Sequence, residues 1–196
     1  MTDPTELPMF TLGSVLFPAM PLPLRVFEPR YVEMLRHVLS EEPAEFGVVL
    51  IERGHEVGGG EQRFGYGTVA RIVQIGAGEE FVTVRAEGRE RIEVVEWLED
   101  DPYPRALVRS VDELEWDVEL EPRREQTEDL VRRTLARASE FEDQMWSATV
   151  ELAEDPITIA WQLAGIAPVG PLDQVALLRS TTMRGLLEAI FTATTE

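Results

Sequence analysis

The segment from Pro8 to Tyr31 constrains the fold of this chain more than any other stretch. It reads as two short apolar strands punctuated by prolines, followed by a helix that begins at Pro29. Proline is tolerated at the first helical position because the N–H that it lacks would have no partner there. Apolar residues then recur at helical spacing over about three turns, and they are Tyr31, Met34, Leu35, Val38 and Leu39.

Strand-like runs continue after this helix as far as residue 111. Glycine-rich stretches separate several of them, which is typical of turns between strands. Imperfect alternation of apolar and polar residues in one run, at 91–97, predicts a bulge. Several short strands with a single early helix predict an α+β fold that starts with a curled mixed sheet or small barrel. The runs lie at residues 46–51, 67–75, 81–86, 91–97 and 106–111.

The pattern changes in the acid-rich stretch from Asp112 to Pro122, where a helix period replaces the strand period. We therefore predict a domain boundary near residue 120, with a β-domain over residues 1–120 and a helical bundle over residues 121–196.

Four helices are expected in the second part of the chain. The first is predicted to carry one apolar face made of Leu130, Val131, Leu135, Ala138, Phe141 and Met145. Asp155 and Pro156 are a favourable cap and first turn for the second helix, and Gly165 is a plausible stop. A short helix follows Pro171, and the last apolar stripe consists of Met183, Leu186, Leu187, Ile190 and Phe191.

The composition excludes several kinds of chemistry. All 18 basic residues are arginine, and arginine stays protonated, so Ser–Lys hydrolases, P-loop NTPases and Schiff-base enzymes are excluded. The absence of cysteine excludes disulfides, thiolate nucleophiles and Cys-ligated zinc. No apolar run approaches the ~18–20 residues that span a bilayer, and the first residues do not resemble a signal peptide. These features predict a cytoplasmic protein.

The net charge of −19 argues against nucleic acid and membranes as partners, because phosphate backbones and anionic lipids are repelled. RNA binding is a further alternative, for which the arginines within residues 123–137 would supply a local basic face. Acidic neighbours interleave them, however, so this alternative is not preferred.

Motifs for catalysis or ligand chemistry are weak. His55 and Glu56 begin like a zinc-protease motif, but Gly59 stands where the second histidine would be needed. The run Gly58–Gly60 lacks the spacing and lysine of a phosphate-binding loop. No serine lies in a nucleophile elbow, and His37 falls on the predicted first helix. We therefore predict no catalytic, cofactor-binding or metal-binding residues, and no cofactor.

Four separated blocks of this sequence resemble the N-terminal, substrate-binding domain of Lon proteases, in the expected order. They are Leu16–Tyr31, Gly65–Ile72, Ala86–Ile92 and Asp155–Ala160. The resemblance implies a PUA-like β-domain followed by a small helical bundle, a pair that helps full Lon proteases to recognise unfolded or damaged substrates. Because the sequence stops at Glu196, we expect a standalone member without the ATPase and protease domains.

The resemblance leads to a non-catalytic protein-binding module as the first functional hypothesis. Its expected partners are unfolded or damaged polypeptides, while a separate protease and a second copy of the chain are left open. The module would hold exposed apolar segments of clients, or act as an adaptor in protein quality control. The alternative is a small-molecule hydrolase or ligand sensor with an acidic cleft in the β-domain, which would need two carboxyl groups with different environments.

Two groups of residues are singled out as sites. Aromatic and methionine side chains suit an adaptable grip on apolar segments, and the candidates are Phe17, Met20, Tyr66 and Trp97. Core packing is the other explanation for each of them. Glu28, Pro29 and Arg30 are predicted to form a structural corner held by charge-assisted hydrogen bonds, with contact to a ligand as the alternative.

Overall fold

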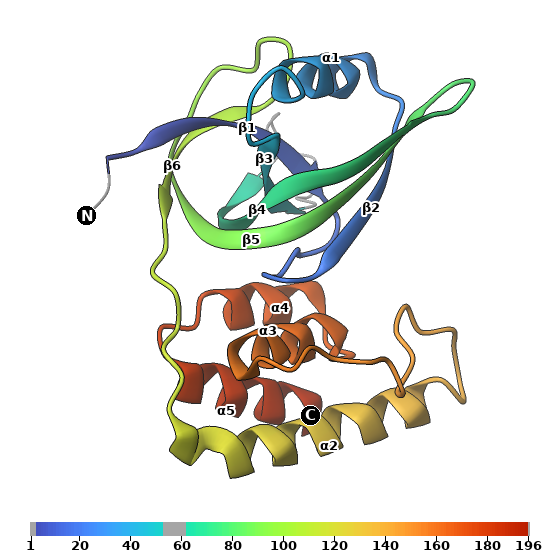
Figure 1. Ribbon diagram of the computed structural model, residues 1–196, viewed down its shortest axis with the longest axis vertical. Helices are drawn as coiled ribbons and strands as arrows, with labels where there is room; N and C mark the ends of the chain where they lie inside the picture. The colour runs from blue at the N-terminus through green and yellow to red at the C-terminus, as the bar shows by residue number, and fades with distance from the viewer. Residues whose placement is uncertain (1–2, 53–61, 196) are drawn as a thin grey trace. The chain divides into compact units, whose positions relative to one another are not determined.

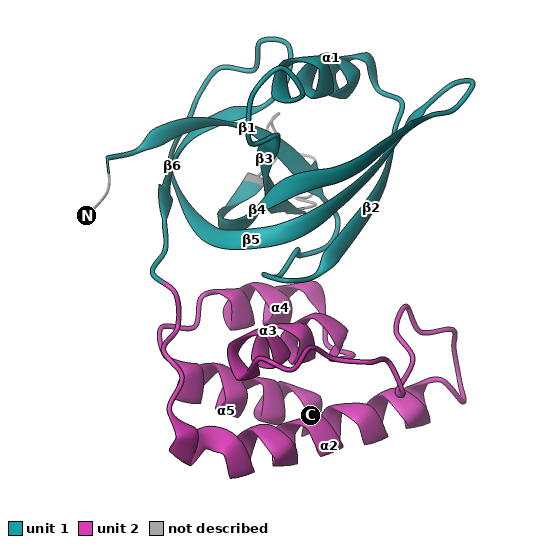
Figure 2. Cartoon of the chain, viewed as in Figure 1, with its two compact units in different colours: residues 1–112 teal, residues 113–196 magenta. Residues whose placement is uncertain are grey.

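The computed structural model of the chain describes residues 3–52 and 62–195. The chain forms two compact units, Met1–Asp112 and Glu113–Glu196 (Figure 2). The first contains the strands and the second contains the later helices, whereas the sequence placed the change near residue 120. The observed and predicted boundaries differ because the acid-rich stretch after Asp112 belongs to the second unit.

Unit 1 is a small barrel with one helix, α1 (Pro29–Val38), at one end (Figure 1). Its strands are β1 (Thr5–Leu12), β2 (Pro21–Val26), β3 (Glu45–Glu52), β4 (Gln62–Ala77), β5 (Val82–Trp97) and β6 (Arg105–Ser110). The order in the sheet is β2-β5-β4-β3-β1-β6, and β5 also pairs with β6, which closes the barrel. The pair β1–β3 is parallel and the others are antiparallel. The predicted curled mixed sheet with one early helix is confirmed.

Strand β5 closes the barrel because it bends and serves two partners. Its first half pairs with β2 and its second half with β6. The predicted bulge in residues 91–97 is confirmed by a register shift between Val94 and Glu96. At the bend, Gly88 lies against the chain at Phe17, where a Cβ atom would overlap the Phe17 carbonyl oxygen. The residue at this position must therefore lack a side chain.

The barrel core is built from inward-facing residues of five strands. Its central cluster consists of Met9, Val49, Val69, Ile92, Ala106 and Val108, all buried. The helix α1 buries the stripe that the sequence predicted, with Tyr31, Met34, Leu35 and Val38 facing inward. Only Leu39, which follows the helix, is exposed.

Strand β2 lies at an edge of the described sheet, and prolines occupy its outward positions. The Gly88 N–H donates to the Met20 carbonyl at 2.9 Å, so residues of even number in β2 direct their backbone groups toward β5. Pro21 and Pro23 then lie where an N–H would point away from the sheet. Their missing donors cost nothing to the barrel and make this edge a poor template for another strand.

Unit 2 is a helical bundle, as predicted. It contains a short 3₁₀ turn (Val118–Leu120) and the helices α2 (Glu121–Ala138), α3 (Pro156–Ile166), α4 (Pro171–Leu178) and α5 (Met183–Thr195). The predicted start of α3 is confirmed, because the Asp155 carboxylate accepts a hydrogen bond from the Thr158 N–H at 2.8 Å. Hydrogen bonds from the backbone and side chain of Thr158 lower the pKa of Asp155. None of the described helices has the length and apolar character needed to cross a bilayer.

The prediction that one helix face extends to Met145 is wrong. Helix α2 ends at Ala138, and the side chains of Phe141 and Met145 are each 87% exposed. The reason is the run of acids after the helix, Glu140, Glu142 and Asp143. Negative charge is unfavourable at a helix C-terminus, where the helix dipole is also negative.

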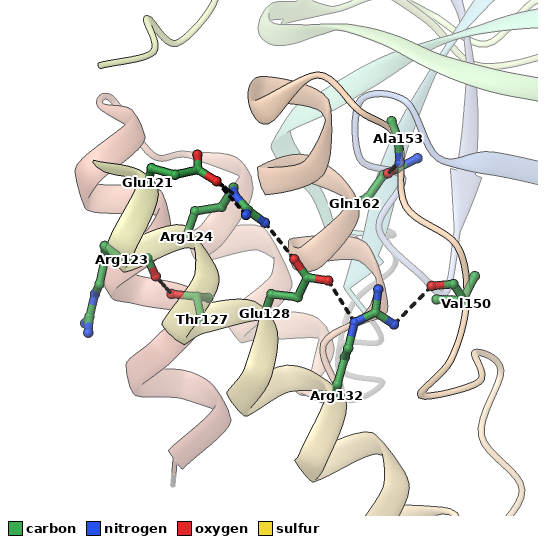
Figure 3. A network of polar contacts seen from close by, with 9 residues as sticks. All are labelled: Glu121, Arg123, Arg124, Thr127, Glu128, Arg132, Val150, Ala153 and Gln162. Carbon is green, nitrogen blue, oxygen red and sulfur yellow. Dashed lines mark hydrogen bonds and ion pairs between the residues drawn. The ribbon is translucent and has the colours of Figure 1, made fainter. Parts of the chain in front are cut away.

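A polar network fixes the chain beyond α2 (Figure 3). Arg124 contacts Glu121 and Glu128 at 2.6 Å, and Glu128 accepts a further hydrogen bond from Arg132. Arg132 in turn donates to the carbonyl oxygens of Ala148 and Val150, at 2.8 and 3.0 Å. Partial burial would raise the pKa of Glu128, but the hydrogen bonds from Arg132 and Arg124 outweigh it and lower this pKa. The ion-pair ladder thus ties the segment after α2 back onto the helix.

Candidate binding groove

A groove of about 360 Å³ opens in unit 1 where β1, β2 and α1 meet. We call it the corner groove, because the turn from β2 into α1 forms one of its sides. Its lining residues are Phe10, Thr11, Leu12, Gly13, Leu24, Arg25, Phe27, Glu28, Arg30, Tyr31 and Ile51. Its size falls within the range of small binding pockets in proteins.

The floor of the groove is an aromatic pair that the fold holds rigidly. The rings of Phe10 and Tyr31 stack with centroids 4.1 Å apart and an interplanar angle of 23°. The hydroxyl groups of Tyr31 and Thr11 lie 3.1 Å apart and share a hydrogen bond. Both rings are buried, so the floor is apolar and already formed without a ligand.

The rim contains an apolar side chain that has no cover. Phe27 is 68% exposed, although a phenylalanine ring is among the side chains that gain most from burial. Its position is fixed on both sides, since Val26 is buried in the barrel and Glu28 is the N-cap residue of α1. Half-buried Leu24 also lines the groove. The rim therefore presents an aromatic anchor next to an aromatic floor.

Charged residues complete the rim. The guanidinium Nε of Arg30 lies 3.1 Å from a carboxylate oxygen of Glu28, and its Cζ lies 4.8 Å from the centre of the Tyr31 ring. Arg25 lies over the ring of Phe81, with 5.2 Å between its Cζ and the ring centre. Glu28 and Arg30 thus make the contact that a structural corner requires, and they also line the groove. The pair is largely solvated and contributes at most ~1 kcal/mol, so both roles considered for it stay predictions.

The groove is chemically suited to contact rather than to bond cleavage. Its lining side chains include one carboxyl group, one threonine and one tyrosine, and no histidine or serine. The acidic-cleft alternative needs two carboxyl groups in the β-domain, whereas only Glu28 lines this groove. No group of three or more potential metal ligands is found among the described residues.

An acid-rich hollow of about 760 Å³ does exist, but it lies in unit 2. It is lined by Glu113, Glu115, Asp117 and the start of α5. Of the remaining motif residues, His37 is exposed on α1. His55, Glu56, Gly58, Gly59 and Gly60 lie outside the described residues.

None of the four predicted client-binding residues lines the corner groove. Phe17 and Met20 are buried, with 1% and 6% of their surface exposed, and they lie near Gly88, which favours packing as the explanation. Tyr66 and Trp97 are half-buried; Tyr66 faces Glu93 across the sheet, and Trp97 faces Ala106. Glu93, the partner of Tyr66, and Trp97 are four residues apart on β5, which is about 13 Å along a strand. A client-binding role for any of the four stays a prediction.

Trp97 also has contacts that explain its position without a client. It packs against the central core cluster of the barrel. The guanidinium of Arg63 lies over its ring at 4.7 Å from the centre.

Sequence reasoning missed Phe10, Phe27 and Tyr31 as groove residues. Tyr31 was expected on the buried stripe of α1, where it does lie, but its neighbours were unknown. Phe27 carried a usable signal: Leu22, Leu24 and Val26 alternate with Pro21, Pro23 and Arg25. The alternation places Phe27 on the outward side, in phase with Arg25. An aromatic residue at such a position is a candidate anchor.

A closed barrel whose groove has an aromatic floor and a charged rim, followed in the chain by a helical unit, is the class of architecture that this chain shows. Comparison with known families gives the particular one. The family model described as "ATP-dependent protease La (LON) substrate-binding domain" matches residues 6–194. The chain belongs to this family, and the resemblance found in the four sequence blocks is confirmed.

Relatives and solved structures agree with this assignment. The chain is 30% identical to the Lon protease of Anaeromyxobacter dehalogenans over 77% of its length, and 26% identical to that of Syntrophus aciditrophicus over 95%. The chain spans between 12% and 24% of the length of the curated relatives that it matches.

Two solved structures share the fold. A Lon N-terminal domain protein from Xanthomonas campestris is 26% identical with a TM-score of 0.63, and the match covers 94% of this chain and 96% of that one. The N-terminal domain of Lon protease from the Mycobacterium avium complex has a TM-score of 0.68 at 16% identity, with 98% and 99% covered. At 16% identity the second likeness concerns the fold alone.

Proposed function

We propose that this chain is a non-catalytic protein-binding module that holds exposed apolar segments of unfolded or damaged proteins in the corner groove. The observation that carries the proposal is the exposed ring of Phe27 beside the stacked floor of Phe10 and Tyr31. Membership of the Lon substrate-binding family supports a protein as the ligand. In a cell the module would work as an adaptor that presents such clients to a separate protease.

The groove favours weak and broadly selective binding. Full burial of one phenylalanine side chain contributes about 1.5–3 kcal/mol, which corresponds to roughly 10- to 150-fold in affinity. The floor rings gain less because they are already buried. A single large anchor therefore distinguishes apolar from polar segments without reading a particular sequence, as a quality-control module must.

The charge of the chain supports the same class of ligand. With a net charge of −19, the chain repels nucleic acids and anionic membranes over distances set by the ionic strength. Neutral and basic polypeptides are not repelled. Clients in the cytoplasm would therefore be selected by exposed apolar surface and disfavoured only when they are strongly acidic.

A matched pair of variants tests the proposal. Phe27 and Leu172 are both 68% exposed, the first on the groove rim and the second on α4. We expect Phe27→Asp to weaken binding of a labelled, permanently unfolded polypeptide by at least about 10-fold in fluorescence anisotropy. Leu172→Asp adds the same charge and should leave binding unchanged. Equal effects of the two variants, or wild-type affinity in Phe27→Asp, would contradict the proposal.

A further inference from the structure

The chain itself exposes an apolar segment of the kind that the groove is proposed to bind. No other large apolar side chain among the described residues is more exposed than Phe141 and Met145. Both lie in residues 139–147, which we call the pseudo-client segment. The pair lies four residues apart, outside any helix or strand. Both side chains are therefore available for contact with another molecule.

This segment is held in place rather than left as a frayed helix end. Its first part is tied to α2, because the N–H groups of Phe141 and Glu142 donate to the Ala138 carbonyl at 3.0 and 3.1 Å. Just beyond its last part, Arg132 donates to the carbonyl group of Ala148 and to that of Val150. Figure 3 shows the contact with Val150. A segment held at both ends loses less conformational freedom on binding than a free chain.

The charges of the segment and the groove rim are complementary. The segment carries three carboxylates, Glu140, Glu142 and Asp143, and no basic residue. The groove rim carries Arg25 and Arg30 against one carboxylate, Glu28. If Phe141 were buried in the groove, the carboxylates beside it would meet the arginines of the rim. This charge complementarity favours the segment over one with basic neighbours.

We propose that the pseudo-client segment of one copy of the chain occupies the corner groove of a second copy. The proposal rests on the proposed function, since it assigns a further ligand to the same groove. Phe141 would fill the place beside Phe27 over the aromatic floor, with the acidic neighbours toward Arg25 and Arg30. At high concentration copies therefore cover each other's grooves, and clients must displace them.

The net charge predicts an unusual salt dependence for this self-association. Two copies of charge −19 repel each other, and the screening length is about 30 Å at 0.01 M salt but only about 8 Å at 0.15 M. At low salt the whole-molecule repulsion dominates. At 0.15 M mainly the charges next to the groove act, so self-association should be stronger at 0.15 M than at 0.01 M salt.

A peptide experiment tests the contact directly. The probe is a fluorescein-labelled peptide of residues 138–147, added to the full chain and followed by anisotropy. We expect binding that weakens at least about 10-fold when the protein carries Phe27→Asp, and equally when the peptide carries F141A and M145A. Leu172→Asp in the protein is the control and should bind the peptide as the wild type does. Binding that ignores either change would overturn the proposal.

Mixing two variants of the full chain gives the stricter test. In sedimentation velocity, Phe27→Asp and Phe141→Asp should each stay monomeric at a concentration where the wild type associates. Their mixture should form a 1:1 complex, because one supplies the segment and the other supplies the groove. A mixture that stays monomeric, or association that persists in Phe141→Asp alone, overturns the proposal.

Client binding separates this proposal from the proposed function. If Phe141→Asp holds an unfolded client through Phe27 but the peptide does not bind, the self-association fails and the proposed function stands. If client binding does not depend on Phe27, the proposed function fails first. A concentration-independent gain of client binding in Phe141→Asp would place the segment in the groove of its own chain and also overturn the proposal.

Discussion

Substitution of Gly88 by alanine tests the barrel closure on which the corner groove depends. The residue sits at the bend of β5, where its N–H donates to Met20 and its carbonyl accepts from the Ala19 N–H, each at 2.9 Å. A Cβ atom there would overlap the Phe17 carbonyl oxygen and lie 3.0 Å from the carbonyl carbon and 3.3 Å from the Pro18 Cα. These are backbone atoms, so no side-chain rotation relieves the overlap.

The expected loss of stability follows from these contacts. Overpacking costs about 1–3 kcal/mol, and weakening two hydrogen bonds adds about 0.5–1.5 kcal/mol each. We therefore expect Gly88→Ala to lower the free energy of unfolding of unit 1 by about 2–6 kcal/mol. The matched control is Gly65→Ala in β4, where a Cβ atom meets nothing within 4 Å. That change should be neutral within about 1 kcal/mol.

Hydrogen–deuterium exchange in increasing urea measures this difference, because peptides from β4 and β5 report unit 1 alone. Gly88→Ala should lose protection in these strands at a much lower urea concentration than the wild type, and Gly65→Ala should follow the wild type. If the two alanine variants unfold together, the close approach of Gly88 to Phe17 does not limit the barrel, and the reasoning from closure is refuted.

Two further predictions concern unit 2. Asp155→Ala removes the N-cap bond to Thr158 and should lower the stability of unit 2 by about 1 kcal/mol in urea denaturation; an unchanged midpoint would contradict the cap. The pKa of Glu128 is lowered in the fold, so its contribution is complete above the ordinary carboxyl pKa of 4.5 and is lost as the pH falls through the lowered value. The protection factors of amides in residues 139–150 should therefore fall at acid pH, and at neutral pH in Glu128→Gln, while exposed Glu125→Gln should leave them unchanged.

Much of the barrel could be predicted from the sequence because its signals are local. Alternation, proline positions and glycine turns depend on neighbouring residues, and they located α1, the bulge before Glu96 and most strands. The runs predicted at 81–86 and 91–97 form the single strand β5 instead of two strands. The capped start of α3 is equally local, since Asp155 and Thr158 lie within one turn. The four sequence blocks added the order of the parts, which local patterns do not contain.

The groove could not be predicted in the same way, because exposure depends on contacts between distant segments. Phe17 is buried and its backbone lies against Gly88 of β5, a contact that the residues around Phe17 do not reveal. Phe10 stacks on the ring of Tyr31. Neighbouring Thr11 shares a hydrogen bond with Tyr31 although the two lie 20 positions apart in the sequence. The predicted end of α2 was wrong for another reason. Apolar residues continue at helical spacing as far as Met145, but the acidic run after Ala138 ends the helix earlier.

The prolines of β2 bear on how a client can be held. An extended client that joined the sheet at the edge strand β2 would need the backbone there to donate and accept hydrogen bonds. Pro21 and Pro23 remove two of the outward donors, and among the outward positions 21, 23 and 25 only Arg25 keeps one. Backbone pairing at β2 is thus disfavoured for any client sequence, whereas the corner groove still offers Phe27 and its aromatic floor. The proposed client binding would therefore depend on the apolar side chains that clients expose.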